Sequence, residues 1–160
     1  MKCCAGSVER LSLYLTFIHD EGMVHFPQFP DQILQKMRTL RLNACGIGQT
    51  GFDLLAETVP LLPSLKSLDI CANKGGDGSA VKLFQALGKH SKLEQLLIGR
   101  TPIFTDDVVA LCELVHSLKS FRKLSIGINE EMSPQCVQQL VRTVLSPSSV
   151  RELIITVCSH

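Results

Sequence analysis

One spacing of apolar residues recurs six times along the chain, at intervals of 28 or 29 residues. The clearest copy runs from Leu65 to Asn73, where apolar residues hold the first, fourth and sixth places and an asparagine holds the ninth. The six units start near residues 8, 37, 65, 93, 121 and 150. A fixed period of this length is typical of solenoid proteins, in which each unit packs on its neighbours.

Each unit predicts one strand and one return segment. The fourth and sixth places alternate apolar with polar residues, which is the period of a strand with one buried face. Consecutive parallel strands need a crossover, and the later units supply it as an amphipathic helix. The helical face after the start at residues 105–107 consists of Val108, Leu111, Val115 and Leu118. In the fifth unit, Ser133 and Pro134 suit the first turn of such a helix.

The return segment of the first unit is unlike the others. Residues 23–30 contain two prolines and two phenylalanines, so the sequence predicts no long helix there. Only Asp31 to Lys36 has helical character. Two interpretations stay open for this segment: an irregular return over the outer face, or a loop that binds a partner.

The pattern L-x-x-L-x-L-x-x-N/C-x-L, followed by a glycine-containing loop and a helix, resembles the ribonuclease-inhibitor type of leucine-rich repeat. The closest matches are Arg41 to Ile47 and Leu68 to Asn73. Thr16 and Thr101 depart from the family at the ninth place, and we expect looser turns there. The ninth-place residues that follow the family are Cys45, Asn73, Asn129 and Cys158.

This resemblance covers about residues 8–158 and implies one α/β domain over residues 1–160. The expected shape is a horseshoe arc of about six units, with a parallel sheet on the concave face and helices on the convex face. The mix of 28- and 29-residue units is most similar to the sensing region of NOD-like receptors. That similarity implies a piece of a longer intracellular receptor of innate immunity.

Composition agrees with such a module. The chain is 45% hydrophobic, yet no apolar run approaches the roughly 18 residues of a membrane span. A net charge of +1 lacks the strongly basic character that is typical of nucleic-acid-binding domains. The start of the chain lacks the apolar run of a signal peptide, and nothing beside Cys3 and Cys4 supplies a second lipidation signal. Seven cysteines, an odd number, favour free thiols in a reducing compartment. We therefore expect a cytoplasmic protein without membrane or nucleic-acid contacts.

Two glycine-rich stretches resemble phosphate-binding loops. Residues 46–51 match G-x-G-x-x-G, and Asp69 lies 18 residues further on. Three residues separate the strand from the first glycine, however, and the repeat already accounts for Ile47, so we do not expect a nucleotide there. Residues 74–79 open a helix but lack the spacing and the terminal lysine of a P-loop. We interpret them as a flexible connection and expect no cofactor.

The fourth unit places Cys112 and His116 one helical turn apart, a spacing that suits a Cys-His pair or two metal ligands. No third ligand stands near them in the sequence, so we interpret both as packing residues between helices. No Ser-His-Asp set or carboxylate pair is evident either. The sequence therefore predicts no catalytic residues and no metal, and the protein is not expected to be an enzyme.

Side chains at the third, fifth and seventh places alternate with the buried ones and face away from the helices. Together with Arg100, which directly follows the seventh place of the fourth unit, they suggest a polar protein-binding patch made of Tyr14, Arg41, Asp69 and Arg100. Arg41 and Asp69 occupy the same place in neighbouring units, so we expect them to pair. The function predicted from this surface is a non-catalytic module for protein binding or ligand sensing through the concave face. The alternative is a structural or autoinhibitory segment of a larger regulatory protein.

Two further expectations concern the turns and the last unit. Cys45 and Cys158 are expected to be buried and reduced at their ninth places. The sixth unit has a strand at residues 153–158 but no crossover helix, and Ile154 and Val157 add apolar surface beside its unpaired edge. Either the chain is a piece of a longer array, or two copies meet at this edge. The second explanation predicts weak self-association.

Overall fold

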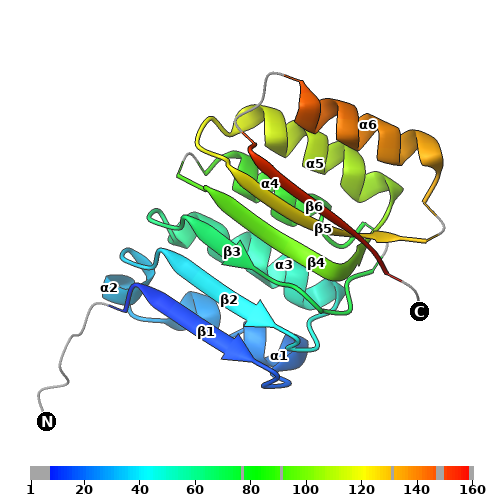
Figure 1. Cartoon of the computed structure of the whole chain (residues 1–160). Coiled ribbons are helices and arrows are strands. Elements are labelled where there is room, and N and C mark those ends of the chain that lie inside the picture. Colours follow the sequence, from blue (N-terminus) through cyan, green and yellow to red (C-terminus); the bar gives the residue numbers. More distant parts are fainter. Residues whose placement is uncertain (1–7, 77, 91, 131, 147–149, 159–160) are drawn as a thin grey trace, which may run out of the picture.

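Six strands form a single parallel sheet, and the helices cover one of its two faces (Figure 1). The structure is a computed structural model that describes residues 8–76, 78–90, 92–130, 132–146 and 150–158. Within these ranges the sheet follows the chain in the order β1-β2-β3-β4-β5-β6. The strands are β1 (Arg10–Tyr14), β2 (Thr39–Asn43), β3 (Ser67–Asp69), β4 (Gln95–Ile103), β5 (Lys123–Asn129) and β6 (Glu152–Cys158).

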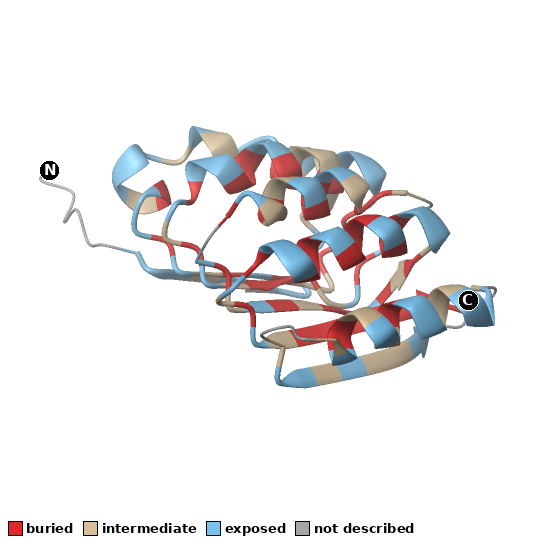
Figure 2. Cartoon of the chain, turned by 90° about the horizontal axis from the view of Figure 1, so that it is seen from above, coloured by how far each residue is buried: buried red, intermediate tan, exposed pale blue. Residues whose placement is uncertain are grey.

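The crossovers form a second layer behind the sheet. Their helices are α1 (His19–Met23), η1 (Phe26–Gln28), α2 (Asp31–Leu34), α3 (Gln49–Thr58), η2 (Val59–Leu61), α4 (Val81–Gly88), α5 (Thr105–Ser117) and α6 (Pro134–Leu145). The sheet lines the concave side of the resulting arc and the helices line its convex side (Figure 2). The expected leucine-rich-repeat solenoid is thereby confirmed. None of these described helices is long and apolar enough to cross a membrane.

The register of the sheet follows the sequence repeat. Leu11 pairs with Leu40 at the fourth place, and Leu40 in turn pairs with Leu68. The fourth- and sixth-place side chains of β2 to β5 are almost completely buried. Figure 2 colours the buried residues of the strands and helices red. Burial of a Leu or Ile side chain stabilises the fold by roughly 1.5–3 kcal/mol, so this double row is the main stabilising feature of the array.

The first crossover, between β1 and β2, is irregular, in agreement with the first of the two interpretations of this segment. Three short helices replace the long helix of the later units, and α1 was not predicted. Met23, Phe26 and Leu34 are buried in the core. Their packing explains why a segment so rich in proline still carries apolar residues.

Ninth-place residues join neighbouring units. Asn73 accepts hydrogen bonds from the backbone N–H of Cys45 and of Ile47, both at 3.1 Å. Its amide donates to the carbonyl of Leu42 and to that of Ile70, both at 2.8 Å. These contacts satisfy backbone groups that the turn would otherwise bury without partners.

The ninth-place threonines also contact neighbouring units, and one expectation about the ninth-place cysteines is wrong. The hydroxyl of Thr101 is buried, donates to the carbonyl of Ile70 at 3.0 Å and accepts from the N–H of Asn73 at 2.9 Å, so this threonine links its unit to the preceding one. Thr16 lies 3.4 Å from the sulfur of Cys45, measured from its hydroxyl oxygen. Cys45 is buried as expected, but Cys158 is only half-buried, because β6 is the last strand of the described sheet.

A bulge interrupts β4. Ile98 pairs with Ile126, but the next pair is Pro102 with Gly127, so three residues of β4 stand outside the register. Gly127 makes room for them: a Cβ atom there would lie 2.7 Å from the carbonyl oxygen of Thr101 and 2.6 Å from the sulfur of Cys158. The seventh-place row that the sequence predicts is therefore broken at β4.

Candidate protein-binding face

The side of the sheet opposite the helices carries the third-, fifth- and seventh-place side chains, and we call it the concave face. In β1 these residues are exposed, whereas Leu11 and Leu13 face the helices. Tyr14 is 68% exposed, and Arg41 is exposed on the neighbouring strand. These two predicted site residues are thus free to contact a partner.

Asp69 differs from its predicted role. Its carboxylate is buried, and Oδ1 accepts hydrogen bonds from the side-chain amide of Asn43 at 2.7 Å and from the N–H of Cys71 at 3.2 Å. The four ion pairs within the described residues do not include Arg41 with Asp69, so the predicted pairing is wrong. These donors hold the carboxylate at the ends of the strands, although Arg41 is its neighbour in the register.

Arg100 occupies the crest of the β4 bulge. Its φ of +59° lies in the left-handed region, which residues other than glycine adopt only at an energetic cost. Its backbone N–H donates to the hydroxyl of Thr156 on β6 at 3.3 Å, so the bulge crosses above Gly127 of β5. The bulge presents the exposed Arg100 side chain on the concave face, which is a common use of bulges near functional sites.

Two thiols flank Arg100. Burial raises the pKa of Cys71 to about 12, with further contributions from the hydrogen bond and the negative charge of Asp69. The backbone of Gly99 and the positive charge of Arg100 oppose this shift. Burial also raises the pKa of Cys158, and Arg100 again acts in the opposite direction. Both thiols are therefore protonated near neutral pH and are not nucleophiles.

Together these residues form one polar row across the ends of the first four strands. Its members in chain order are Tyr14, Asn43, Asp69, Cys71 and Arg100. Three strand spacings of about 4.8 Å make the row roughly 14 Å long. Arg41 lies on β2, two residues before Asn43, and is therefore closer than the row to the starts of the strands. From the sequence alone, Asn43 and Cys71 are only residues at outward-facing places. The structure shows that they hold the carboxylate of Asp69.

An apolar corner adjoins this row at β1. Leu15 and Phe17 are 53% and 66% exposed. Leu15, Phe17 and His19 all have positive φ values, of 53°, 48° and 50°. The sequence contained a signal for this corner, because Leu15 and Phe17 fall outside the apolar places of the repeat. Exposed apolar groups beside a tyrosine enlarge the surface that a partner protein could cover.

The two glycine-rich stretches do not form phosphate sites. The N–H of Gly48 at the start of α3 donates to Asp20 at 2.7 Å, and the ring of His19 packs on Gly46. The N–H of Ala80 at the start of α4 donates to Asp107 at 2.9 Å. Carboxylates of neighbouring units thus occupy the places that a phosphate would take. Asp77 of the second stretch lies outside the described residues.

Cys112 is buried as expected, but His116 is exposed, so the expectation that it packs between helices is wrong. His116 contacts the carbonyl of Cys112 at 2.9 Å through Nδ1, so its ring caps its own helix. Burial raises the pKa of Cys112, and the hydroxyl of Thr143 on α6 opposes that shift. Within the described ranges no three His, Cys, Asp or Glu side chains are arranged to hold a metal ion.

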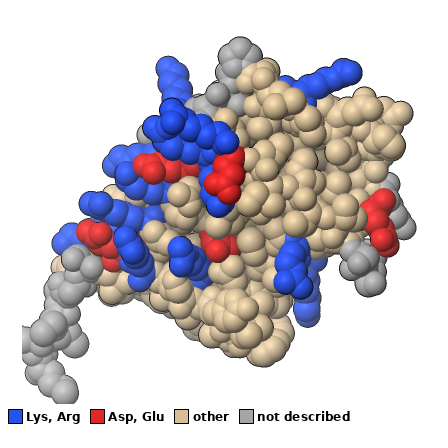
Figure 3. All heavy atoms as spheres, viewed as in Figure 1, with Lys and Arg blue, Asp and Glu red and all other residues tan. Residues whose placement is uncertain are grey.

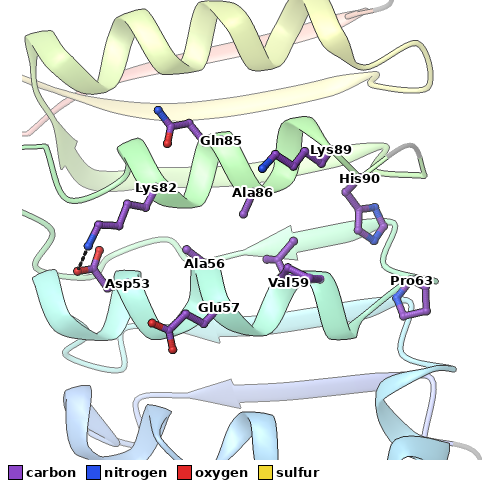
Figure 4. Close-up of a pocket in the computed structure, with 11 residues that line it drawn as sticks. Asp53, Ala56, Glu57, Val59, Pro63, Lys82, Gln85, Ala86, Lys89 and His90 are labelled. Atoms are coloured by element: carbon purple, nitrogen blue, oxygen red, sulfur yellow. Dashed lines mark hydrogen bonds and ion pairs between the residues drawn. The ribbon is translucent and has the colours of Figure 1, made fainter.

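A groove of about 590 Å³ separates α3 from α4 on the convex side (Figure 4). An ion pair of 2.7 Å between Lys82 and Asp53 closes one end. His90 lies at the other end, where its Nε2 contacts the carbonyl of Leu62 at 2.6 Å. Ala56 and Val59 contribute apolar lining.

Comparisons with known proteins agree with the fold. No protein-family model matches the sequence. A ribonuclease inhibitor of Mus musculus is 26% identical over 144 residues, which are 89% of this chain. The chain spans only 31% of the length of that inhibitor. The similarity is consistent with the repeat pattern described above.

One similar solved structure is the leiomodin-1 actin-binding site 2. It superposes with a TM-score of 0.66 at 10% sequence identity, over 85% of this chain and 78% of that one. At this identity the likeness concerns the fold alone.

Proposed function

We propose that the protein is a non-catalytic binding module that holds another protein on its concave face. The observation that carries this proposal is the exposure of Tyr14, Arg41 and Arg100 on the same side of a rigid sheet. Tyr and Arg are the side chains most often found at the energetic centres of protein interfaces. A curved parallel sheet also presents an extended surface without paying for loop ordering on binding.

The two similar proteins support this proposal through their names. One is an inhibitor of ribonuclease and the other is an actin-binding site, so both names describe action on another protein. The same names favour a non-enzymatic role for this chain. Fold alone does not identify a partner, because leucine-rich repeats serve many different ones.

The proposal is tested by capturing partners from a cytosolic extract with the wild-type protein and with two variants. Arg41→Glu and Tyr14→Ala should each reduce the amount of the captured partner without changing the melting temperature. Arg142→Glu is the matched control, because Arg142 is an exposed arginine of α6 on the opposite layer. Equal capture by all four proteins would overturn the proposal.

The narrower assignment concerns the biological setting. The mix of 28- and 29-residue units supports a role in the sensing region of an intracellular, NOD-like receptor of innate immunity. The odd number of cysteines, with all five described ones free, supports a cytoplasmic location. A structural or autoinhibitory segment of a larger regulatory protein is the second candidate, and it predicts binding to other parts of that same protein rather than to a separate one.

A further inference from the structure

Positive charge gathers at one border of the concave face, although the chain is nearly neutral. Figure 3 shows Lys and Arg crowded over the starts of the strands, beside a largely uncharged surface. Every unit contributes one exposed cation at or beside its second place, and we call this row the basic rim. Its members are Arg10, Arg38, Lys66, Lys92, Arg122 and Arg151.

The imbalance is larger than the net charge suggests. With Lys36 and Lys123, which flank it, the rim holds eight of the 16 Lys and Arg residues. Only three of the 15 acidic residues, Glu9, Glu94 and Glu152, lie at the same places. The rest of the chain therefore carries eight cations against twelve anions, so the molecule has a basic border and an acidic remainder.

Backbone hydrogen bonds hold the rim in line. The carbonyl of Glu9 accepts from the N–H groups of Arg38 and Thr39, at 2.7 and 3.0 Å. The carbonyl of Arg38 accepts in the same way from the N–H groups of Lys66 and Ser67. The same pattern is repeated at each following strand, up to the N–H groups of Arg151 and Glu152 at β6. These five paired contacts fix the spacing of the cations, so a ligand need not order the backbone that carries them.

Several rim cations lack an ion-pair partner in the part of the chain that the structure describes. The carboxylates of the rim pair Glu9 with Arg38 at 3.6 Å, Glu94 with Lys66 at 2.7 Å and Glu152 with Lys123 at 2.8 Å. The cations without such a contact there are Arg10, Lys92, Arg122 and Arg151.

The surface at the rim is hollowed. An open hollow of about 460 Å³ is lined by three rim cations and by the hydroxyls of Ser64 and Ser120. A second hollow, of about 300 Å³, shares Lys66 and Glu94 with the first and extends to Arg10 on β1. Cations together with hydroxyl donors match the hydrogen-bonding needs of carboxylates.

We infer that the basic rim binds an acidic segment of a partner protein, lying across the strands in extended form. Six strands span five spacings of about 4.8 Å, or about 24 Å, which about seven extended residues would cover. The inference deepens the proposed function, because the rim borders the concave face, and it rests on that function for the identity of the ligand as a protein.

A nucleic acid fits the rim less well than an acidic peptide. Glu9, Glu94 and Glu152 stand among the cations and would face a continuous line of phosphates. None of the twelve residues at the second and third places has an aromatic side chain on which bases could stack. Separate carboxylates on a flexible segment can avoid these glutamates and still contact the unpaired cations.

The test uses a fluorescently labelled peptide of eight glutamates and follows its anisotropy as the full chain is added at low ionic strength. The triple variant Lys92→Ser, Arg122→Ser, Arg151→Ser removes three unpaired rim cations and should weaken binding about tenfold. The matched control Lys74→Ser, Lys89→Ser, Arg142→Ser removes three exposed cations elsewhere and should leave the affinity unchanged.

Three results would overturn the inference: no binding of the glutamate peptide, an equal loss in both triple variants, or tighter binding of a labelled oligo-dT of eight nucleotides than of the peptide. The variant Tyr14→Ala, which tests the concave face in the proposed function, is included in the same titration. It should not affect the glutamate peptide, because Tyr14 lies at the far end of β1 from the rim. Failure of the rim thus remains distinguishable from failure of the concave face.

Discussion

The side-chain amide of Asn43 donates a 2.7 Å hydrogen bond to Oδ1 of Asp69 on the neighbouring strand. The same oxygen accepts from the N–H of Cys71, which follows β3. Asp69 therefore ties two strand ends together and adds to the effect of burial in raising the pKa of the Cys71 thiol, instead of offering a free charge to a partner. The first two predictions test this arrangement.

Replacement of Asp69 by Asn should make Cys71 react faster with iodoacetamide at pH 8. Burial is the main reason why the pKa of Cys71 is raised, but the Asp69 carboxylate adds to the shift, and its removal leaves Arg100 to favour the thiolate. Alkylation is followed peptide by peptide with mass spectrometry. Cys158 serves as the control, because burial and not Asp69 raises its pKa. An unchanged or slower reaction of Cys71 would contradict the argument.

Stability should fall at alkaline pH through Cys71. The folded protein holds this proton up to a pKa of about 12, whereas the thiol of the unfolded chain releases it near the ordinary value of 9.0. The unfolded state is therefore favoured increasingly as pH rises from 9 towards 12. Urea unfolding at pH 8 and pH 10 should show a larger loss for the wild type than for Cys71→Ser. Parallel losses in the two proteins would count against this assignment.

Asn73→Ala should lower the free energy of unfolding by about 3 kcal/mol, because several buried backbone groups would lose their partners. Thr16→Ala at the same place of the first unit should cost no more than about 0.5 kcal/mol, because Thr16 is exposed. Chemical denaturation of both variants provides the measurement. Similar costs would mean that the ninth-place contacts do not stabilise the array as described.

Gly127→Ala should destabilise the protein by roughly 1–3 kcal/mol, since the added methyl group would collide with the β4 bulge. Gly76→Ala is the control: its added Cβ would meet its nearest neighbour at 3.6 Å, an ordinary contact. Thermal unfolding should therefore separate the two variants. Equal melting temperatures would show that the bulge yields easily.

The expected self-association through β6 gives the last prediction. Ile154 and Val157 are 39% and 65% exposed on this strand, which pairs only with β5 among the described strands. Sedimentation at rising concentration should show weak association, and Ile154→Lys combined with Val157→Lys should abolish it. A wild type that stays monomeric at high concentration would rule the association out.

The repeat predicted which residues pair between neighbouring strands, although not where each strand ends or that β4 has a bulge. Pairing of Leu40 with Leu68, and every third-place pair of the sheet, follows from counting 28 or 29 residues. The period carries this information because a parallel array must repeat its register at each turn of the solenoid. Helix starts were predictable where they depend on local chemistry, as at Ser133, which accepts from the N–H of Cys136 at 3.3 Å.

The features that the sequence did not reveal depend on contacts between units. Asp107 lies in the first turn of α5, and only the structure shows that it also accepts a hydrogen bond from the N–H of Ala80, 27 residues earlier. Asp69 and Arg41 share a place in the repeat, but Asn43 and Cys71 compete successfully for the carboxylate. The basic rim was hidden by a net charge of +1, because that sum does not tell where the charges lie.

The hydrogen bond from Arg100 to Thr156 joins residues 56 positions apart and passes over the strand between them. A linear array ordinarily unfolds by fraying, because each terminal repeat is held by one neighbour alone. Here the fourth and sixth repeats hold each other directly, so loss of the last repeat also releases the bulge that rests on the fifth. The three repeats should behave as one cooperative unit, and amide exchange in β6 should occur at the same free energy as exchange at the end of β4.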